Sequence, residues 1–270
     1  MRPPGERRAD LAAALGPLVD GEFTECQVEV RTPPCLGLDE LHGRLVRARA
    51  AVVRAAEAEK LRVLPSGTPP QAVPDRAPVT DEPRYRTAAE RFRGMTERYL
   101  VCASHTHVHL PDPEAAVLVS NHLRPWLPAL VAMAANSPFC EGRDTGYASW
   151  RAIARLPFPV LGPPPYYRSL KHYRQLTSAM YEGGLLRAGD EVFWDVRISS
   201  HVPTLEVRAM DVPATAADTA VLAAIVRALV VVALMSVRAG APDRRSAASC
   251  RARPTGVRRG TDGAVTAWTS

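Results

Sequence analysis

Three histidines alternate along residues 101–111: His105, His107 and His109. Successive side chains of a β-strand point to opposite faces, so this spacing places the three imidazoles on one face. A neutral imidazole offers a lone pair to a metal ion, and a protonated imidazole donates to phosphate near neutral pH. The pattern therefore indicates metal ligation or the handling of phosphate and protons. A half-exposed strand whose histidines bind water or neighbouring groups is the alternative.

Acidic side chains alternate in a second predicted strand, residues 22–31, which is rich in β-forming residues. If this strand is regular, Glu25, Gln27 and Glu29 share one face. Carboxylate and amide oxygens could bind a divalent cation there. A solvated face would give the same pattern.

Two later predicted strands each send an acid and an arginine to the same face. The pairs are Asp195 with Arg197 in residues 192–198, and Glu206 with Arg208 in residues 203–211. Because guanidinium groups match the geometry of phosphate and carboxylate, these faces suit a nucleotide or a carboxylate substrate. Carboxylates and histidines would hold Mg²⁺ or Mn²⁺, and the arginines would neutralise phosphate.

Helices and loops must position these strands. Apolar periodicity and capping residues predict helices at residues 38–61, 85–99, 112–121, 125–135, 169–186 and 218–237. A short strand is predicted at residues 62–65. Residues 66–83 and 136–151 are polar loops that could border a site. The expected fold class is α+β: a curved, mainly antiparallel sheet with helices packed on one face and the site on the other.

Composition limits the possible partners. The 270 residues carry a formal net charge of +6, but residues 238–270 hold +5, residues 1–10 hold +1 and the interior is neutral, so nucleic-acid binding is not expected. The longest apolar run, residues 221–237, contains Arg227 and is short for a bilayer span, so we expect a buried helix and no membrane.

Five cysteines without CxxC pairing or a secretory signal favour a reducing cytosol, hence a cytoplasmic protein. Without GxxxxGK[ST] or GxGxxG, any nucleotide is held by neither a P-loop nor a Rossmann turn.

Several motifs together resemble the bacterial carboxylate-amine ligase family, also called type 2 glutamate–cysteine ligase. They are Thr-Glu-Cys-Gln-Val-Glu-Val-Arg-Thr-Pro-Pro-Cys at 24–35, Cys-x-x-His-x-His-Val-x-x-Pro-Asp at 102–112, Asn-His-Leu-Arg-Pro-Trp at 121–126, Ala-Asn-Ser-Pro-Phe at 135–139, Gly-Arg-Asp-Thr-Gly-Tyr-Ala-Ser at 142–149 and Thr-Leu-Glu-Val-Arg-x-x-Asp at 204–211. The resemblance covers residues 18–237 and keeps the family's motif order.

The resemblance implies a glutamine-synthetase-like fold and an ATP-dependent ligase that joins glutamate to cysteine through an acyl phosphate. It implies ATP and Mg²⁺ or Mn²⁺ as cofactors, small-molecule substrates, and a possible homo-oligomer. The implied metal ligands are Glu29, His105 and Glu206, with Glu25 a weaker candidate. His107, Arg197 and Arg208 would face the phosphates, while Asn136, Ser137 and Arg151 would contact the amino-acid substrate. No role is implied for His109.

The sequence departs from the family pattern at both ends. The usual Gly-x-Glu-x-Glu strand does not precede residue 18, and the usual Trp-Arg-Ala-x-Arg-Tyr-Gly-like motif is replaced by the Arg-rich stretch 238–270. We therefore expect an N-terminal lead (1–17), a partial catalytic domain (18–237) and a disordered tail (238–270) that resembles out-of-frame sequence. Two alternatives stay open. One is an inactive homologue that binds nucleotide or a partner; the other, suggested by His-Thr-His-Val-His, is a metal-dependent hydrolase.

Overall fold

The computed structural model describes residues 19–72, 77–187 and 191–241, together with the backbone of residues 257–259 and 265–267. Its centre is an antiparallel sheet of three strands, β3 (Ala103–His109), β9 (Thr204–Asp211) and β8 (Val196–Ile198), with β9 in the middle. Leu205 and Val207 of β9 are buried, whereas Thr204 is only partly covered. The alternating pattern thus directs one face of the sheet to the core.

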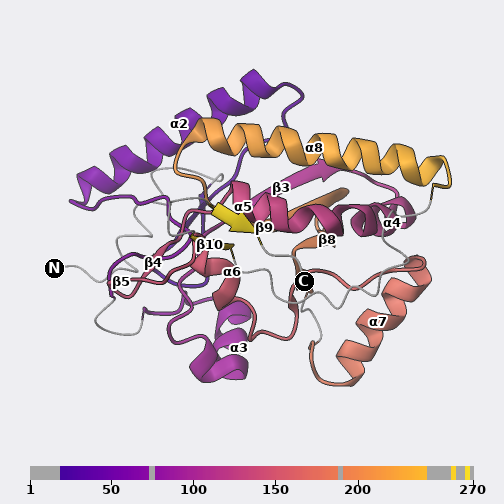
Figure 1. Ribbon diagram of the computed structural model, residues 1–270. Coiled ribbons are helices and arrows are strands. Elements are labelled where there is room, and N and C mark those ends of the chain that lie inside the picture. Colours follow the sequence, from indigo (N-terminus) through magenta and orange to yellow (C-terminus); the bar gives the residue numbers. More distant parts are fainter. Residues whose placement is uncertain (1–18, 73–76, 188–190, 242–256, 260–264, 268–270) are drawn as a thin grey trace.

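Three helices pack on the apolar face of this sheet: α4 (Pro113–Leu123), α5 (Leu127–Met133) and α8 (Ala216–Arg238). Figure 1 shows α8 lying across the sheet with α2 (Leu38–Ala58) alongside it. Helix α4 begins where predicted, because the Asp112 carboxylate accepts from the Glu114 and Ala115 amides at its N-terminus. The main core lies between this layer and β9. Fully burying each large apolar side chain stabilises the fold by about 1.5–3 kcal/mol.

A smaller core lies under α7 (Leu170–Glu182), at the lower right of Figure 1. Tyr167 and Trp194 are its largest members, with ring centroids 5.8 Å apart. Asn121 ties this region to α4, because its side chain donates to the Tyr167 carbonyl and accepts from the Tyr167 amide. The two cores therefore share α4 as a common wall.

Short elements complete the described chain. They are β1 (Val19–Gly21), β2 (Val28–Val30), α3 (Pro83–Phe92), η2 (Arg93–Met95), η3 (Arg124–Trp126), β4 (Phe139–Cys140), β5 (Arg143–Asp144), α6 (Trp150–Ala154), β6 (Leu161–Gly162), β7 (Phe193–Trp194), β10 (Val257–Arg259) and β11 (Val265–Ala267). β1 pairs with β2, β4 with β5 and β10 with β11, all antiparallel, while β6 and β7 are parallel. The mixed α+β class with helices on one sheet face is confirmed.

The predicted strand at residues 22–31 forms only at residues 28–30, which are β2. Residues 22–27 form a turn between β1 and β2, because the Gln27 side chain folds inward. Its Oε1 accepts from the Thr24 amide and hydroxyl, and its Nε2 donates to the Val101 carbonyl. Glu25, Gln27 and Glu29 consequently share no strand face, and β2 pairs with β1 rather than joining the central sheet.

Three other predictions need correction. The segment 192–198 is interrupted at Asp195, and residues 62–65 form no strand. Helix α8 is buried on one side only. By length and composition it could cross a membrane, and it exposes Val221, Val231, Val232 and Met235. Apart from β10, β11 and residues 238–241, the predicted tail lies outside the described residues, as does the predicted N-terminal lead.

Candidate functional site

A β-bulge organises the polar face of the central sheet. Thr106 pairs with Val207 and Ser104 with Met210, so Arg208 and Ala209 together oppose the single residue His105. The extra residue reverses the alternation of β9. Asp211 therefore lies on the same face as Glu206, although their spacing in a regular strand would place them on opposite faces.

Glu206 is the centre of the exposed half of this face. Only 2% of its side chain is exposed, and its Oε2 accepts from Arg197 Nε at 2.6 Å. Its Oε1 accepts from Arg208 and lies 3.5 Å from His105 Nδ1 and 3.6 Å from His107 Nε2. The sequence correctly predicted that these five side chains come together. We call them the Glu206 cluster.

Protonation in the Glu206 cluster follows from burial and from its two arginines. Burial and the nearby Arg208 hold the pKa of His105 well below its usual value, and burial also lowers the pKa of His107. Burial raises the pKa of Glu206, but the neighbouring Arg208 and Arg197 lower it by more. The pKa of Glu206 therefore lies below its usual value. The cluster at neutral pH therefore holds two neutral imidazoles, an ionised carboxylate and two cations.

Arg197 and His107 have further contacts at the rim of the cluster. Arg197 also contacts the Glu191 carboxylate at 2.5 Å and donates to the Val192 carbonyl. The buried Nε of Arg208 has no hydrogen-bond partner. His107 is 41% exposed and its Nδ1 lies 2.8 Å from the Thr204 hydroxyl. The cluster thus combines a partly open face at His107 with two guanidinium groups, an arrangement that suits a bound anion.

A second group, which we call the Asp211 cluster, lies at the other end of β9. The buried Asp211 carboxylate accepts from the Ser137 hydroxyl at 2.6 Å, the Ser149 hydroxyl at 3.0 Å and the backbone amide of Asn136 at 3.0 Å. Gly67 packs so closely that a Cβ there would lie 2.7 Å from Asp211 Cγ. No role was predicted for Asp211, although it ends the motif at 204–211.

The predicted substrate-binding residues all belong to the Asp211 cluster. Ser137 is fully buried and only 3% of Arg151 is exposed. The Asn136 side chain donates to the carbonyls of Pro65 and Val212. Arg151 donates to the carbonyls of Arg208 and Ala209, so these side chains are engaged in internal hydrogen bonds.

The predicted metal ligands are brought together only in part. His105 and Glu206 are adjacent, but within the described residues no hydrogen bond or ion pair joins Glu25 or Glu29 to them. Burial and Glu22 raise the pKa of Glu29, whereas the nearby Arg208 opposes this rise. Within those same ranges, no group of three or more His, Cys, Asp or Glu side chains is arranged to hold a metal ion. Because arginines occupy both oxygens of Glu206, the cluster suits an anion better than a cation.

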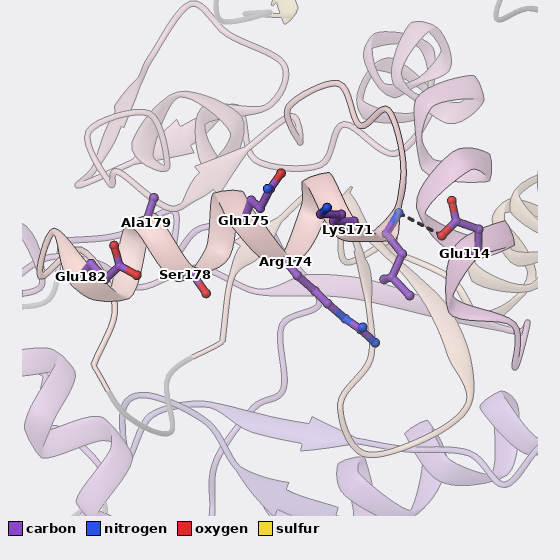
Figure 2. Close-up of a pocket in the computed structure, with 8 residues that line it drawn as sticks. Glu114, Lys171, Arg174, Gln175, Ser178, Ala179 and Glu182 are labelled. Atoms are coloured by element: carbon purple, nitrogen blue, oxygen red, sulfur yellow. Dashed lines mark hydrogen bonds between the residues drawn. The ribbon is translucent and has the colours of Figure 1, made fainter.

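An open hollow lies elsewhere, along α7 (Figure 2). It is open, about 660 Å³ in volume, and lined by polar side chains such as Lys171, Arg174 and Glu182. Glu114 reaches its end and accepts from the Leu170 amide. This hollow shares no residue with the Glu206 cluster, and its lining has no catalytic constellation, so it is not the candidate site.

Comparisons with known proteins agree with the motifs. The family model of "Glutamate-cysteine ligase family 2(GCS2)" matches residues 2–269. The chain is 46% identical over 225 residues to "Putative glutamate--cysteine ligase 2-1" of Nocardia farcinica, covering 83% of this chain and 58% of that protein. It is 43% identical over 230 residues to "Putative glutamate--cysteine ligase 2-2" of Mycobacterium sp. strain KMS, covering 85% and 63%. It is 40% identical over 234 residues to "Putative glutamate--cysteine ligase 2-3" of Mycolicibacterium smegmatis, covering 87% and 64%.

This chain therefore spans about three fifths of the length of these relatives. The alignment with the Nocardia farcinica protein covers more than four fifths of the chain. The match to the family model spans every residue of the Glu206 and Asp211 clusters. On this evidence, the chain belongs to glutamate–cysteine ligase family 2.

Proposed function

We propose that this chain carries the phosphate-handling face of an ATP-dependent carboxylate-amine ligase that joins the γ-carboxylate of glutamate to the amine of cysteine. The observation that supports it most is the convergence of Arg197 and Arg208 beside two neutral histidines on a partly open sheet face. Family membership and the names of the relatives support the ligase class. A glutamine-synthetase-like arrangement of the sheet is part of the proposal.

In this proposal, the glutamate carboxylate takes the terminal phosphoryl group of ATP. This step forms an acyl phosphate and releases ADP. The cysteine amine then attacks the acyl carbon, and the phosphate leaves. Arg197 and Arg208 bind the oxygens of the transferring group and stabilise the charge that develops there. His107, the more exposed imidazole, lies at the rim, where it can accept a proton from an attacking amine.

The Mg²⁺ or Mn²⁺ that the family resemblance implies fits the described residues poorly. Glu206 is neutralised by two arginines, and hard cations prefer several free oxygen ligands. The two guanidinium groups beside Glu206 are donors and favour an anion. We therefore assign the cluster to phosphate and not to a divalent cation.

The test is ADP release by the purified chain in the presence of ATP, glutamate, cysteine and Mg²⁺, compared with the R208Q variant. Loss of one guanidinium from a phosphoryl clamp should lower kcat/KM by about 100-fold or more. The H109Q variant is the matched control, because His109 is exposed at the end of the neighbouring strand β3 and has no role in the proposal. Equal, substrate-independent rates in wild type and R208Q would overturn it.

One observation favours a second function, nucleotide binding without turnover: the described residues assemble no metal-binding group. Calorimetric titration with ATP and Mg²⁺ separates the two functions, because binding without ADP release supports the second. The comparisons give no support to a metal-dependent hydrolase. Homo-oligomerisation and a cytoplasmic location remain proposals, which light scattering and cell fractionation would test.

A further inference from the structure

The bulge in β9 leaves two consecutive carbonyls to be satisfied outside a regular ladder, those of Arg208 and Ala209. A single side chain takes both. One terminal nitrogen of Arg151 donates to the Ala209 carbonyl at 3.0 Å, and the other donates to the Arg208 carbonyl at 3.1 Å. A guanidinium is a planar fork of donors, so it can bridge adjacent carbonyls in a way that the point charge of lysine cannot.

We infer that Arg151 is a positioning residue: by holding the bulge, it directs the Arg208 side chain toward Glu206 and His105. The Arg208 amide is fixed on its other side, where it donates to the Asp195 carbonyl at 2.7 Å. With its peptide groups held at both ends, the Arg208 side chain has a terminal nitrogen 3.4 Å from His105 Nδ1. The importance of this position for phosphate rests on the proposed function.

Arg151 is itself held by the Asp211 cluster. Its amide donates to the Ser137 hydroxyl, and its guanidinium lies 3.6 Å from the Asp211 carboxylate. Burial and the nearby Arg155 lower its pKa to about 10, which still leaves it protonated at neutral pH. Both terminal nitrogens of this buried cation donate to backbone carbonyls of the bulge, and its Nε is buried without a partner, so Arg151 acts on the bulge. The Asp211 cluster thus becomes the anchor of the Glu206 cluster.

The experiment compares R151K with R49K, using the full chain labelled with ¹⁵N-histidine. Arg49 is the matched control because its guanidinium also bridges two consecutive carbonyls, those of Pro213 and Ala214, just beyond β9. The His105 imidazole signals are assigned by their loss in H105Q. R151K should shift them and weaken tripolyphosphate binding about tenfold. R49K should change neither.

If R151K fails to fold, S137A decides, because it keeps the Arg151 guanidinium and removes the hydroxyl that accepts from the Arg151 backbone amide and donates to Asp211. A smaller shift of the His105 signals is then expected. A folded R151K or S137A with unchanged His105 signals overturns the inference. Wild-type protein that binds no tripolyphosphate overturns the proposed function instead, and the imidazole signals still report on the bulge.

Discussion

Two buried carboxylates lie on the same face of β9, and their surroundings differ. Glu206 is surrounded by two arginines and two histidines, of which His107 is 41% exposed. Asp211 accepts from two hydroxyls and an amide and lies beside Arg151, with 1% of its surface exposed. The exposed imidazole leaves the Glu206 cluster with a rim open to solvent, while the Asp211 cluster is closed, although each contains arginine.

The comparison teaches that burial of a carboxylate does not by itself decide whether its surroundings open to solvent. Both carboxylates are buried, but beside Glu206 the His107 side chain is 41% exposed, whereas the hydroxyls of Ser137 and Ser149 beside Asp211 form hydrogen bonds inside the protein. The predictions below test this distinction, from the largest expected effect to the smallest.

The D211N variant should lose the most stability. The substitution keeps the shape of the side chain but removes the charge beside Arg151, and an unpaired buried charge typically costs about 3–5 kcal/mol. Urea unfolding of wild type and D211N measures the difference. A loss below about 1 kcal/mol would mean that Asp211 is not the centre of a closed cluster.

The E206Q variant should affect binding more than folding. Removing the carboxylate releases Arg197 and Arg208 for an incoming anion, so tripolyphosphate without divalent cations should bind about tenfold more tightly. Stability should fall by about 1–2 kcal/mol, because charge-assisted hydrogen bonds are lost. Calorimetric titration in EDTA gives the affinity. Weaker or unchanged binding in E206Q would contradict the release of the two arginines.

Acidification should destabilise the protein in two steps. The lowered pKa values of His105 and His107 mean that the unfolded chain binds more protons, so stability falls as pH drops below about 6.5. The lowered pKa of Glu206 adds a loss as pH falls below its usual value, about 4.3. Urea unfolding between about pH 8 and pH 2 shows both. In H105Q, the loss near pH 6 should be smaller, and an unchanged profile would contradict the assignment.

The H109Q variant should have the smallest effect. His109 is exposed at the end of β3, and no contact joins it to the Glu206 cluster among the described residues. Stability should change by no more than about 0.5 kcal/mol and anion affinity should not change. The same unfolding and titration experiments check this, and a tenfold loss of affinity would place His109 in the site.

Much of the fold was predictable because local patterns agree with tertiary packing. The cap at Asp112, the periodicity of α8 and the alternation in β3 were read correctly. The predicted strand at residues 22–31 forms only at residues 28–30. Gln27 forms a hydrogen bond to the Val101 carbonyl, 74 residues away, and no local pattern shows this contact. The exposed side of α8 was missed since its sequence is apolar all round.

The sequence by itself determined the chemistry of the Glu206 cluster. His105, His107, Glu206 and Arg208 follow from period-two spacing, because a strand has only two faces. The tertiary structure alone decided which residues are structural. One extra residue opposite His105 reverses the alternation and brings Asp211 to the polar face. A bulge depends on pairing between β3 and β9, whose residues are about a hundred positions apart, and the spacing within either strand carries no record of it.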